Sequence, residues 1–182
     1  IWENAINMDV AEAFLDELAN RGITSFLVRT KNYHIPLSSR GLYADHLQAA
    51  GMVSIHHNAP MIAPSSDPGA ETFVQSNSVK SARLGTLVYE AVYEALDKFS
   101  WVQWTSQYDA GVIRVLNNRG TDTYGMMSRP KTPTTLIELA YLANPSEARL
   151  LKSAEYLPAV ANALSDGVEE FLQSPSIGTY PT

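Results

Sequence analysis

The sequence predicts a single α/β domain with a mostly parallel, twisted sheet and helices on both faces. Three observations support this fold class. Short apolar runs of strand composition alternate with longer segments in which apolar residues recur every three or four positions. The connections between the short runs are long enough to hold a helix, as parallel strands require. The 182 residues show no internal repeat and no clear linker, and this length suits one domain with a real core.

The first helix is predicted from apolar residues four positions apart, which form one buried stripe: Ile6, Val10, Phe14 and Leu18. Gly22 is expected to end it as a left-handed cap. Residues 23–28, ITSFLV, have strand composition and are predicted to form a strand. Pro36 and the two serines after it open a second helix, which continues to about Ala50 and ends at Gly51.

The middle of the chain is predicted to hold two short strands, at residues 52–55 and 71–74, separated by a proline-rich loop. A long helix over residues 82–99 follows, with apolar residues at helical spacing. Residues 100–133 are expected to be irregular, and the apolar run 134–142 is predicted to be a strand.

Two helices are predicted near the end of the chain. Asn144 and Pro145 break the preceding strand and start a short helix. Apolar residues between positions 157 and 171 mark a last helix. The segment 174–182 is rich in proline, serine and glycine, and is expected to be a flexible tail.

The charge balance and the cysteine count exclude several classes of protein. Lys and Arg number 13 against 19 Asp and Glu, a formal charge of −6, which argues against nucleic-acid binding and against docking on anionic membranes. There is no cysteine, so disulfides and thiolate metal sites are excluded. No apolar run approaches the roughly 20 residues of a membrane span, so none is predicted.

Two adjacent histidines in the stretch VSIHHNAP follow a predicted strand. In an extended segment Ser54, His56 and Asn58 share one face, while Ile55 and His57 lie on the other. At most one of the two histidines is therefore expected to enter a given site. The alternative is that both only form hydrogen bonds near the strand end. His34 and His46 are expected at the surface.

Glu138 lies inside an apolar run, where a carboxylate must be paired, bound to a metal or neutralised. It could be a general base, or it could form a structural ion pair with Arg119 or Arg129. Sites in such sheets gather at the carboxyl ends of the strands, so His56 and Glu138 are expected to share a cleft. Glu3, taken alone, would only complement the positive end of a helix.

Together these segments resemble a known family, the zinc-dependent N-acetylmuramoyl-L-alanine amidases, type 3 catalytic domain, of bacterial and phage cell-wall hydrolases. ENAINMDVA at 3–11 is similar to the family's E-K-x-x-N-L-x-x-A helix start, and VSIHHNA at 53–59 to its S-I-H-A-N-A motif. TTLIELAYLANPSEARLL at 134–151 is similar to P-x-x-L-V-E-L-G-F-L-S-N-x-x-E-x-x-L-L. Further similar segments lie at 28–45 and 69–74, and a looser match lies at 118–129.

The resemblance implies a site and a reaction. Glu3 and His56 are expected to bind Zn²⁺, with Glu138 as the catalytic general base and acid. Asn58 and Glu71 are expected to contact substrate, although Asn58 could simply cap a turn and Glu71 could pair with an arginine. The reaction implied is hydrolysis of the amide between N-acetylmuramic acid and L-alanine of the peptidoglycan stem peptide.

The chain departs from the family pattern in two places near the site. His57 and Ala140 stand where alanine and glycine are usual. The family also opens with a strand and a D-P-G-H-G-G turn, whose histidine is a further metal ligand. No such turn occurs in the sequence, so it is expected upstream of Ile1. The amidase domain is accordingly predicted to cover residues 1–173, without that first strand.

The resemblance also implies a cellular setting: an extracytoplasmic monomer with peptidoglycan as its partner. Two other functions stay open at this stage. One is a degenerate amidase domain that binds peptidoglycan or a protein without cutting, which the absent histidine turn favours and Glu138 disfavours. The other is a metal hydrolase of the same fold that acts on a different amide.

Overall fold

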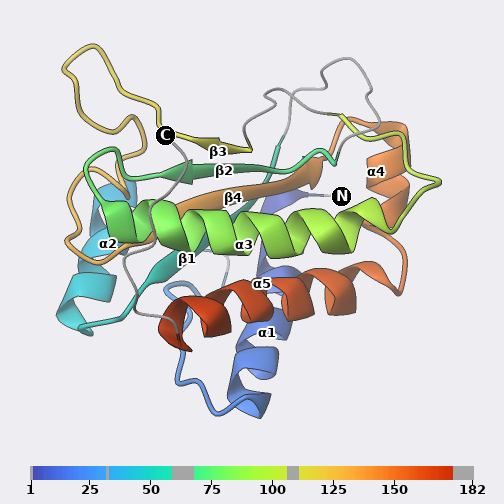
Figure 1. Cartoon of the computed structure of the whole chain (residues 1–182), viewed down its shortest axis with the longest axis horizontal. Coiled ribbons are helices and arrows are strands. Elements are labelled where there is room, and N and C mark those ends of the chain that lie inside the picture. The colour runs from blue at the N-terminus through green and yellow to red at the C-terminus, as the bar shows by residue number, and fades with distance from the viewer. Residues whose placement is uncertain (1, 32, 59–67, 106–110, 174–182) are drawn as a thin grey trace.

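The computed structural model describes residues 2–31, 33–58, 68–105 and 111–173. Five helices and four strands lie in these ranges (Figure 1). The helices are α1 (Glu3–Asn20), α2 (Leu37–His46), α3 (Val79–Asp97), α4 (Pro145–Leu150) and α5 (Tyr156–Gln173). The strands are β1 (Met52–Asn58), β2 (Glu71–Val74), β3 (Val112–Ile113) and β4 (Thr134–Tyr141).

The four strands form one sheet in the order β1-β4-β2-β3. The pairs β1–β4 and β2–β3 are parallel, and β2–β4 is antiparallel. The predicted fold class, one α/β domain with a mostly parallel sheet, is therefore confirmed. The antiparallel pair matters for the site, because it brings the start of β2 beside the second half of β4.

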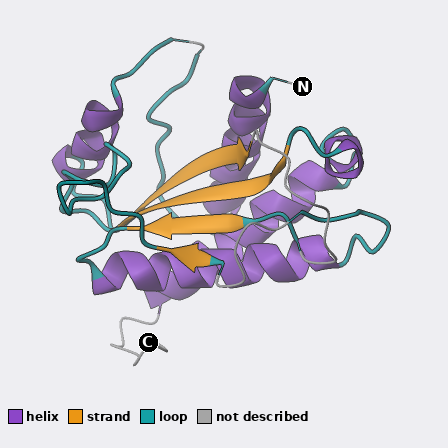
Figure 2. Cartoon of the chain, turned by 90° about the horizontal axis from the view of Figure 1, so that it is seen from above, coloured by secondary structure: helices purple, strands orange, loops and turns teal. Residues whose placement is uncertain are grey.

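The main core lies between the sheet and the three long helices. The stripe of α1 packs with α3, α5 and the β4 residues Ile137 and Leu139 in one buried cluster. The opposite face of the sheet carries a smaller cluster with Phe73, Leu136, Met126 and Met127 at its centre. Helix α2 packs beside this second cluster, where its Gly41 lies close to the Met126 carbonyl. Figure 2 shows helices on both sides of the central strands.

Most helix bounds differ from the predicted ones by a few residues, for reasons of capping. Helix α2 ends at His46, and Gln48 then takes a positive φ of 51°. Helix α3 begins three residues earlier than predicted, because the Ser78 side chain accepts a hydrogen bond from the Ser81 N–H and caps it. Residues 59–67 of the predicted loop and the predicted tail lie outside the described residues.

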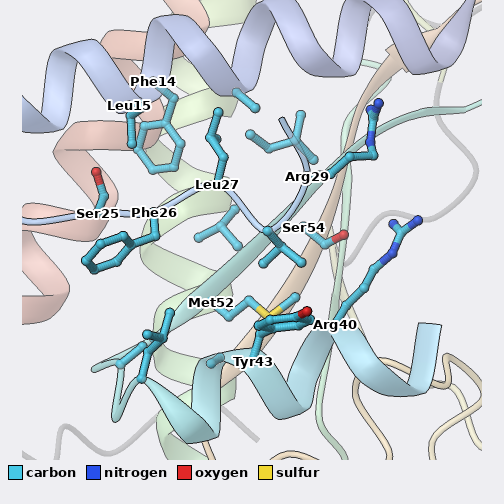
Figure 3. A pocket seen from close by; sticks show the side chains of 18 of the residues that line it. Phe14, Leu15, Ser25, Phe26, Leu27, Arg29, Arg40, Tyr43, Met52 and Ser54 are labelled. Atoms are coloured by element: carbon cyan, nitrogen blue, oxygen red, sulfur yellow. The ribbon is translucent and has the colours of Figure 1, made fainter. Parts of the chain in front are cut away.

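The strand predicted at residues 23–28 is wrong, because this segment has no regular secondary structure. A cavity of about 950 Å³ separates it from β1, so the two backbones do not pair. Figure 3 shows Leu27 across this cavity from Met52 and Tyr43. Strand composition alone is not enough, since a strand needs a neighbour for its backbone hydrogen bonds. Among the described residues, β1 pairs only with β4.

No helix within the described ranges is both long enough and apolar enough to cross a membrane.

Candidate active site

Three neighbouring strands bring His56, Glu138 and Glu71 into one row. His56 on β1 lies opposite Glu138 on β4, and Glu138 lies opposite Glu71 on β2. Residues directly opposite each other in a sheet point to the same face. Leu136, two positions before Glu138, belongs to the cluster on the face away from α1, α3 and α5. The row therefore lies on that face, and the predicted proximity of His56 and Glu138 is confirmed.

Glu138 has the surroundings of a proton-transfer group. Burial raises its pKa to about 7, and the charges of Glu3 and Glu71 add to the shift while His56 opposes it. Its Oε2 atom is buried and accepts no hydrogen bond from the described residues. Arg119 and Arg129 are both exposed, and no ion pair within the described structure involves Glu138. The structural ion pair considered for Glu138 is therefore absent there.

His56 and Glu3 face each other directly. The His56 Nδ1 atom lies 3.0 Å from Glu3 Oε1, and its Nε2 atom lies 3.1 Å from the Ser54 hydroxyl. The hydrogen bond from His56, helped by one from Asn7, lowers the pKa of Glu3 despite partial burial. Because Glu3 stands in the first turn of α1, the positive end of the helix also favours its ionised form.

His57 points to the opposite side of β1, as the alternation of side chains predicts. It is 2% exposed, and its Nδ1 and Nε2 atoms each lie 2.7 Å from a partner, Asn7 Oδ1 and the Tyr156 hydroxyl. Burial lowers the pKa of His57 to about 3, so the ring is neutral at ordinary pH. The two histidines thus have separate environments, one beside Glu138 and one in the core.

The two predicted substrate contacts have different positions. Asn58 is half-buried at the end of β1, next to the row of site residues. Glu71 is fully buried, and its Oε1 accepts a hydrogen bond of 2.8 Å from the Tyr141 hydroxyl. Glu71 contributes to the raised pKa of Glu138. A role of either residue in contacting substrate stays a prediction.

Sequence reasoning missed the residues that support Glu3 and Glu71. Asn7 donates to Glu3 Oε1 at 3.2 Å, and its position four residues after Glu3 was an available signal. Tyr156 and Tyr141 are separated from their partners by 99 and 70 residues. No local pattern points to such pairs. His34 and His46 are exposed, as predicted.

Glu3 and His56 fit as two ligands of one metal ion. Two ligand atoms that each lie 2.0–2.1 Å from a tetrahedral ion are about 3.3 Å apart. The separation of 3.0 Å between Glu3 Oε1 and His56 Nδ1 is close to that value. An ion bound between them would replace the Nδ1 proton. In the part of the chain that the structure describes, no three His, Asp or Glu side chains are grouped to hold a metal.

Comparison with known proteins assigns the family. Residues 1–170 match the family described as N-acetylmuramoyl-L-alanine amidase. Because this match covers nearly the whole chain, the protein belongs to that family of amide-hydrolysing enzymes.

Individual relatives are distant. The chain is 28% identical over 173 residues to the uncharacterized protein YqiI of Bacillus subtilis, covering 94% of this chain and 75% of YqiI. It is 27% identical over 173 residues to the amidase LytC of the same organism, covering 94% of this chain but only 31% of LytC. It is 26% identical over 195 residues to the amidase AmiA of Escherichia coli, covering 91% of this chain and 67% of AmiA.

The fold is shared with solved amidase structures. An N-acetylmuramoyl-L-alanine amidase from Clostridium difficile 630 superposes with a TM-score of 0.78 at 22% identity. That superposition covers 97% of this chain and 87% of the other. The catalytic domain of CwlV, an amidase from Bacillus (Paenibacillus) polymyxa var. colistinus, gives 0.72 at 24% identity, over 94% of this chain and 86% of the other. At these identities the likeness supports the fold alone.

Proposed function

We propose that this chain is the catalytic domain of a zinc-dependent peptidoglycan amidase. It hydrolyses the amide between the lactyl group of N-acetylmuramic acid and L-alanine of the stem peptide. The observation that carries the proposal is the row of His56, Glu138 and Glu71 across three strands, with Glu3 against His56. This row places a carboxyl group with a pKa near neutrality beside a pair of candidate metal ligands.

Glu3 and His56 are the residues that would hold Zn²⁺, with a third protein ligand to be supplied from outside the described residues. Bound zinc would supply Lewis acidity, polarising the scissile carbonyl and easing deprotonation of water. The family resemblance implies that the third ligand is the histidine of the D-P-G-H-G-G turn. Glu3 is ionised at neutral pH, because its hydrogen bonds lower its pKa, and so it is in the form that a cation requires.

Glu138 performs the proton transfers. Its buried Oε2 atom accepts a proton from the attacking water as oxygen adds to the amide carbon. The C–N bond then breaks, and the same carboxyl group gives that proton to the departing nitrogen of L-alanine. The products are a carboxylic acid on the lactyl group and a free peptide amine. A pKa near 7 suits both halves of this exchange at neutral pH.

Asn58 and Glu71 are the neighbouring residues proposed for substrate. Asn58, the last residue of β1, is proposed to hydrogen-bond the peptide. Glu71 is held by the Tyr141 hydroxyl, and from there it acts on Glu138 through charge. Its contribution to substrate binding is therefore proposed to be indirect.

The wider setting is also proposed. The catalytic domain would span residues 1–173 and act as a monomer. It would act outside the cytoplasm, because peptidoglycan is an extracytoplasmic polymer. The relatives LytC and AmiA are named N-acetylmuramoyl-L-alanine amidases, which supports peptidoglycan as the proposed substrate. The acidic net charge of −6 does not favour attachment through anionic wall polymers.

The direct test is digestion of purified peptidoglycan with the zinc-loaded protein, followed by labelling of new amino termini. We expect new L-alanine amino termini from the wild type. The variant Glu138→Gln keeps the shape of the side chain but cannot take a proton, so we expect a rate about 10²–10⁴-fold lower. Glu90→Gln, an exposed change on α3, is the control and should cleave normally.

Other outcomes would contradict the proposal in distinct ways. Binding of peptidoglycan without new amino termini would identify a degenerate domain that binds but does not cut. New termini other than L-alanine would indicate a hydrolase for a different amide. Full activity in Glu138→Gln would remove the catalytic role from that residue.

A further inference from the structure

A chain of hydrogen bonds runs from the core of the domain to Glu3. The Tyr156 hydroxyl lies 2.7 Å from His57 Nε2, and His57 Nδ1 lies 2.7 Å from Asn7 Oδ1. The Asn7 side chain then donates from Nδ2 to Glu3 Oε1 at 3.2 Å. The same carboxylate oxygen faces His56 Nδ1 at 3.0 Å. Four contacts thus connect α5, β1 and α1 to the candidate metal ligands.

The chemistry of the groups fixes the direction of these bonds. A carboxylate only accepts, so the Asn7 amide must turn its NH₂ group toward Glu3. Its carbonyl oxygen then faces His57 and can only accept, which places a proton on His57 Nδ1. The neutral ring therefore has its lone pair on Nε2, where the Tyr156 hydroxyl donates. Each donor in the series meets an acceptor, and no alternative orientation of Asn7 satisfies both neighbours.

The inner half of the series is buried. Tyr156 is fully buried and His57 is 2% exposed, and their rings lie 5.9 Å apart at 57°. Glu3 is different, since 42% of its side chain is exposed and it stands in the first turn of its helix. A half-exposed glutamate has many accessible rotamers. Asn7 and the backbone N–H of His57 both contact its carboxylate, so residue 57 restrains Glu3 in two ways.

We propose that His57 is a positioning residue that holds the Glu3 carboxylate opposite His56 through Asn7. The inference rests on the proposed function, in which Glu3 and His56 hold a metal ion. The imidazole at position 57 bridges Tyr156 and Asn7, and Asn7 donates to Glu3. A core histidine thus orders one of the candidate metal ligands. Hydrogen-bonded partners behind metal ligands typically change metal affinity about 10- to 100-fold.

Two substitutions each remove one of the two hydrogen bonds of the His57 imidazole and keep the other. In His57→Asn the side-chain NH₂ takes the position of Nδ1, so it can still donate to Asn7 while the bond to Tyr156 is lost. In His57→Gln the amide reaches the position of Nε2 and keeps contact with Tyr156, but not with Asn7. Ser165→Ala is the matched control, because it removes a buried hydroxyl of α5 whose only hydrogen bond within the described ranges is to the Ala161 carbonyl.

Zn²⁺ affinity, measured by titration calorimetry on a protein that also carries the proposed third ligand, is the first measurement. We expect the dissociation constant to rise about tenfold or more in His57→Gln. His57→Asn should lose less, and Ser165→Ala should match the wild type. Equal affinities for His57→Gln and the wild type would overturn the proposal, as would a loss in His57→Asn as large as that in His57→Gln.

Two measurements on the metal-free protein test the inference independently of zinc. Long-range ¹H–¹⁵N spectra should show His57 protonated at Nδ1, and protonation at Nε2 alone would contradict the proposed direction of the bonds. In a double-mutant cycle on unfolding stability, Asn7→Ala should cost less in the His57→Gln background than in the wild type. Fully additive costs would show that residues 7 and 57 are not coupled, and would overturn the proposal.

These measurements also separate failure of the inference from failure of the proposed function. If the wild type binds no Zn²⁺, the metal role of Glu3 and His56 is wrong, and with it the role of His57 toward a metal ligand. If Zn²⁺ binds and the His57 variants bind it equally well, the proposed function stands while the positioning role of His57 fails.

Discussion

Two glutamates, the half-buried Glu138 and the buried Glu147, have the same raised pKa of about 7 but different surroundings. Both oxygens of Glu147 accept backbone N–H groups, at 3.0 Å from Thr105 and 2.7 Å from Tyr141. The Oε2 atom of Glu138 accepts no hydrogen bond within the described structure. A shifted pKa alone therefore does not distinguish a structural carboxyl group from a reactive one, and the hydrogen-bond partners do.

Glu147 makes a testable contribution to the pH dependence of stability. Burial raises its folded-state pKa from 4.5 to about 7, against its hydrogen bonds, which lower it. Between these two pH values the folded chain keeps a proton that the unfolded chain has lost. The stability from this group is therefore full below about pH 4.5 and is lost as pH rises to about 7.

We expect Glu147→Gln to remove this pH dependence, because an amide does not titrate. The free energy of unfolding of the wild type minus that of the variant should fall by on the order of 2–3 kcal/mol between pH 4.5 and 7. Urea unfolding of both proteins at several pH values measures this difference. A difference that stays constant with pH would contradict the raised pKa.

At the scale of single elements, Gly85 marks the point where helix α3 packs closely against the sheet. A Cβ atom on Gly85 would lie 2.3 Å from Val74 Cγ1 and 3.0 Å from Thr135 Oγ1. Glycine normally weakens a helix by about 1 kcal/mol relative to alanine. At this position the missing side chain instead allows the helix to sit against β2 and β4.

The variant Gly85→Ala should accordingly be less stable than the wild type, by about 1–3 kcal/mol, in spite of its better helix propensity. Thermal or urea unfolding measures the change. Glu90→Ala, at an exposed position on the same helix, is the control and should change stability by less than about 0.5 kcal/mol. A stabilised Gly85→Ala protein would show that the helix can move away from the sheet at little cost.

Residues 23–28 illustrate the limit of prediction at the level of one element. Their composition is typical of a strand, and the same reasoning correctly placed β1, β2 and β4. Whether such a segment becomes a strand depends on a neighbouring backbone with free donors and acceptors. The cavity between this segment and β1 removes that neighbour, and a single sequence does not reveal the separation.

Across the whole molecule, Arg21 ties the end of α1 to α5. Its guanidinium contacts Glu17, Asp166 and Glu169 at 3.0, 2.7 and 2.9 Å. It also donates to Asn162 Oδ1 at 2.8 Å. The arginine side chain is 15% exposed, whereas its partners are 32–53% exposed, so solvent screens part of the attraction.

We expect Arg21→Met to lower the free energy of unfolding by about 1 kcal/mol at low ionic strength, and by less in 1 M NaCl. Arg83→Met is the matched control, because Arg83 donates to the backbone carbonyls of Phe171 and Glu170 and, among the described residues, to no carboxylate. Its cost should depend little on salt. Urea denaturation of the wild type and both variants at two salt concentrations measures these changes in the free energy of unfolding. If both substitutions showed the same salt dependence, an electrostatic role for Arg21 would be contradicted.

The sequence by itself determined the fold class, most of the elements and the separation of His56 from His57. These features depend on local periodicity and on the alternation of side chains along a strand, which neighbouring residues encode. Only the tertiary structure decided that Glu71 lies beside Glu138, that Asn7 links Glu3 to His57, and that residues 23–28 form no strand. Those outcomes depend on which backbones come together, since hydrogen bonds and burial act between segments that lie far apart along the chain.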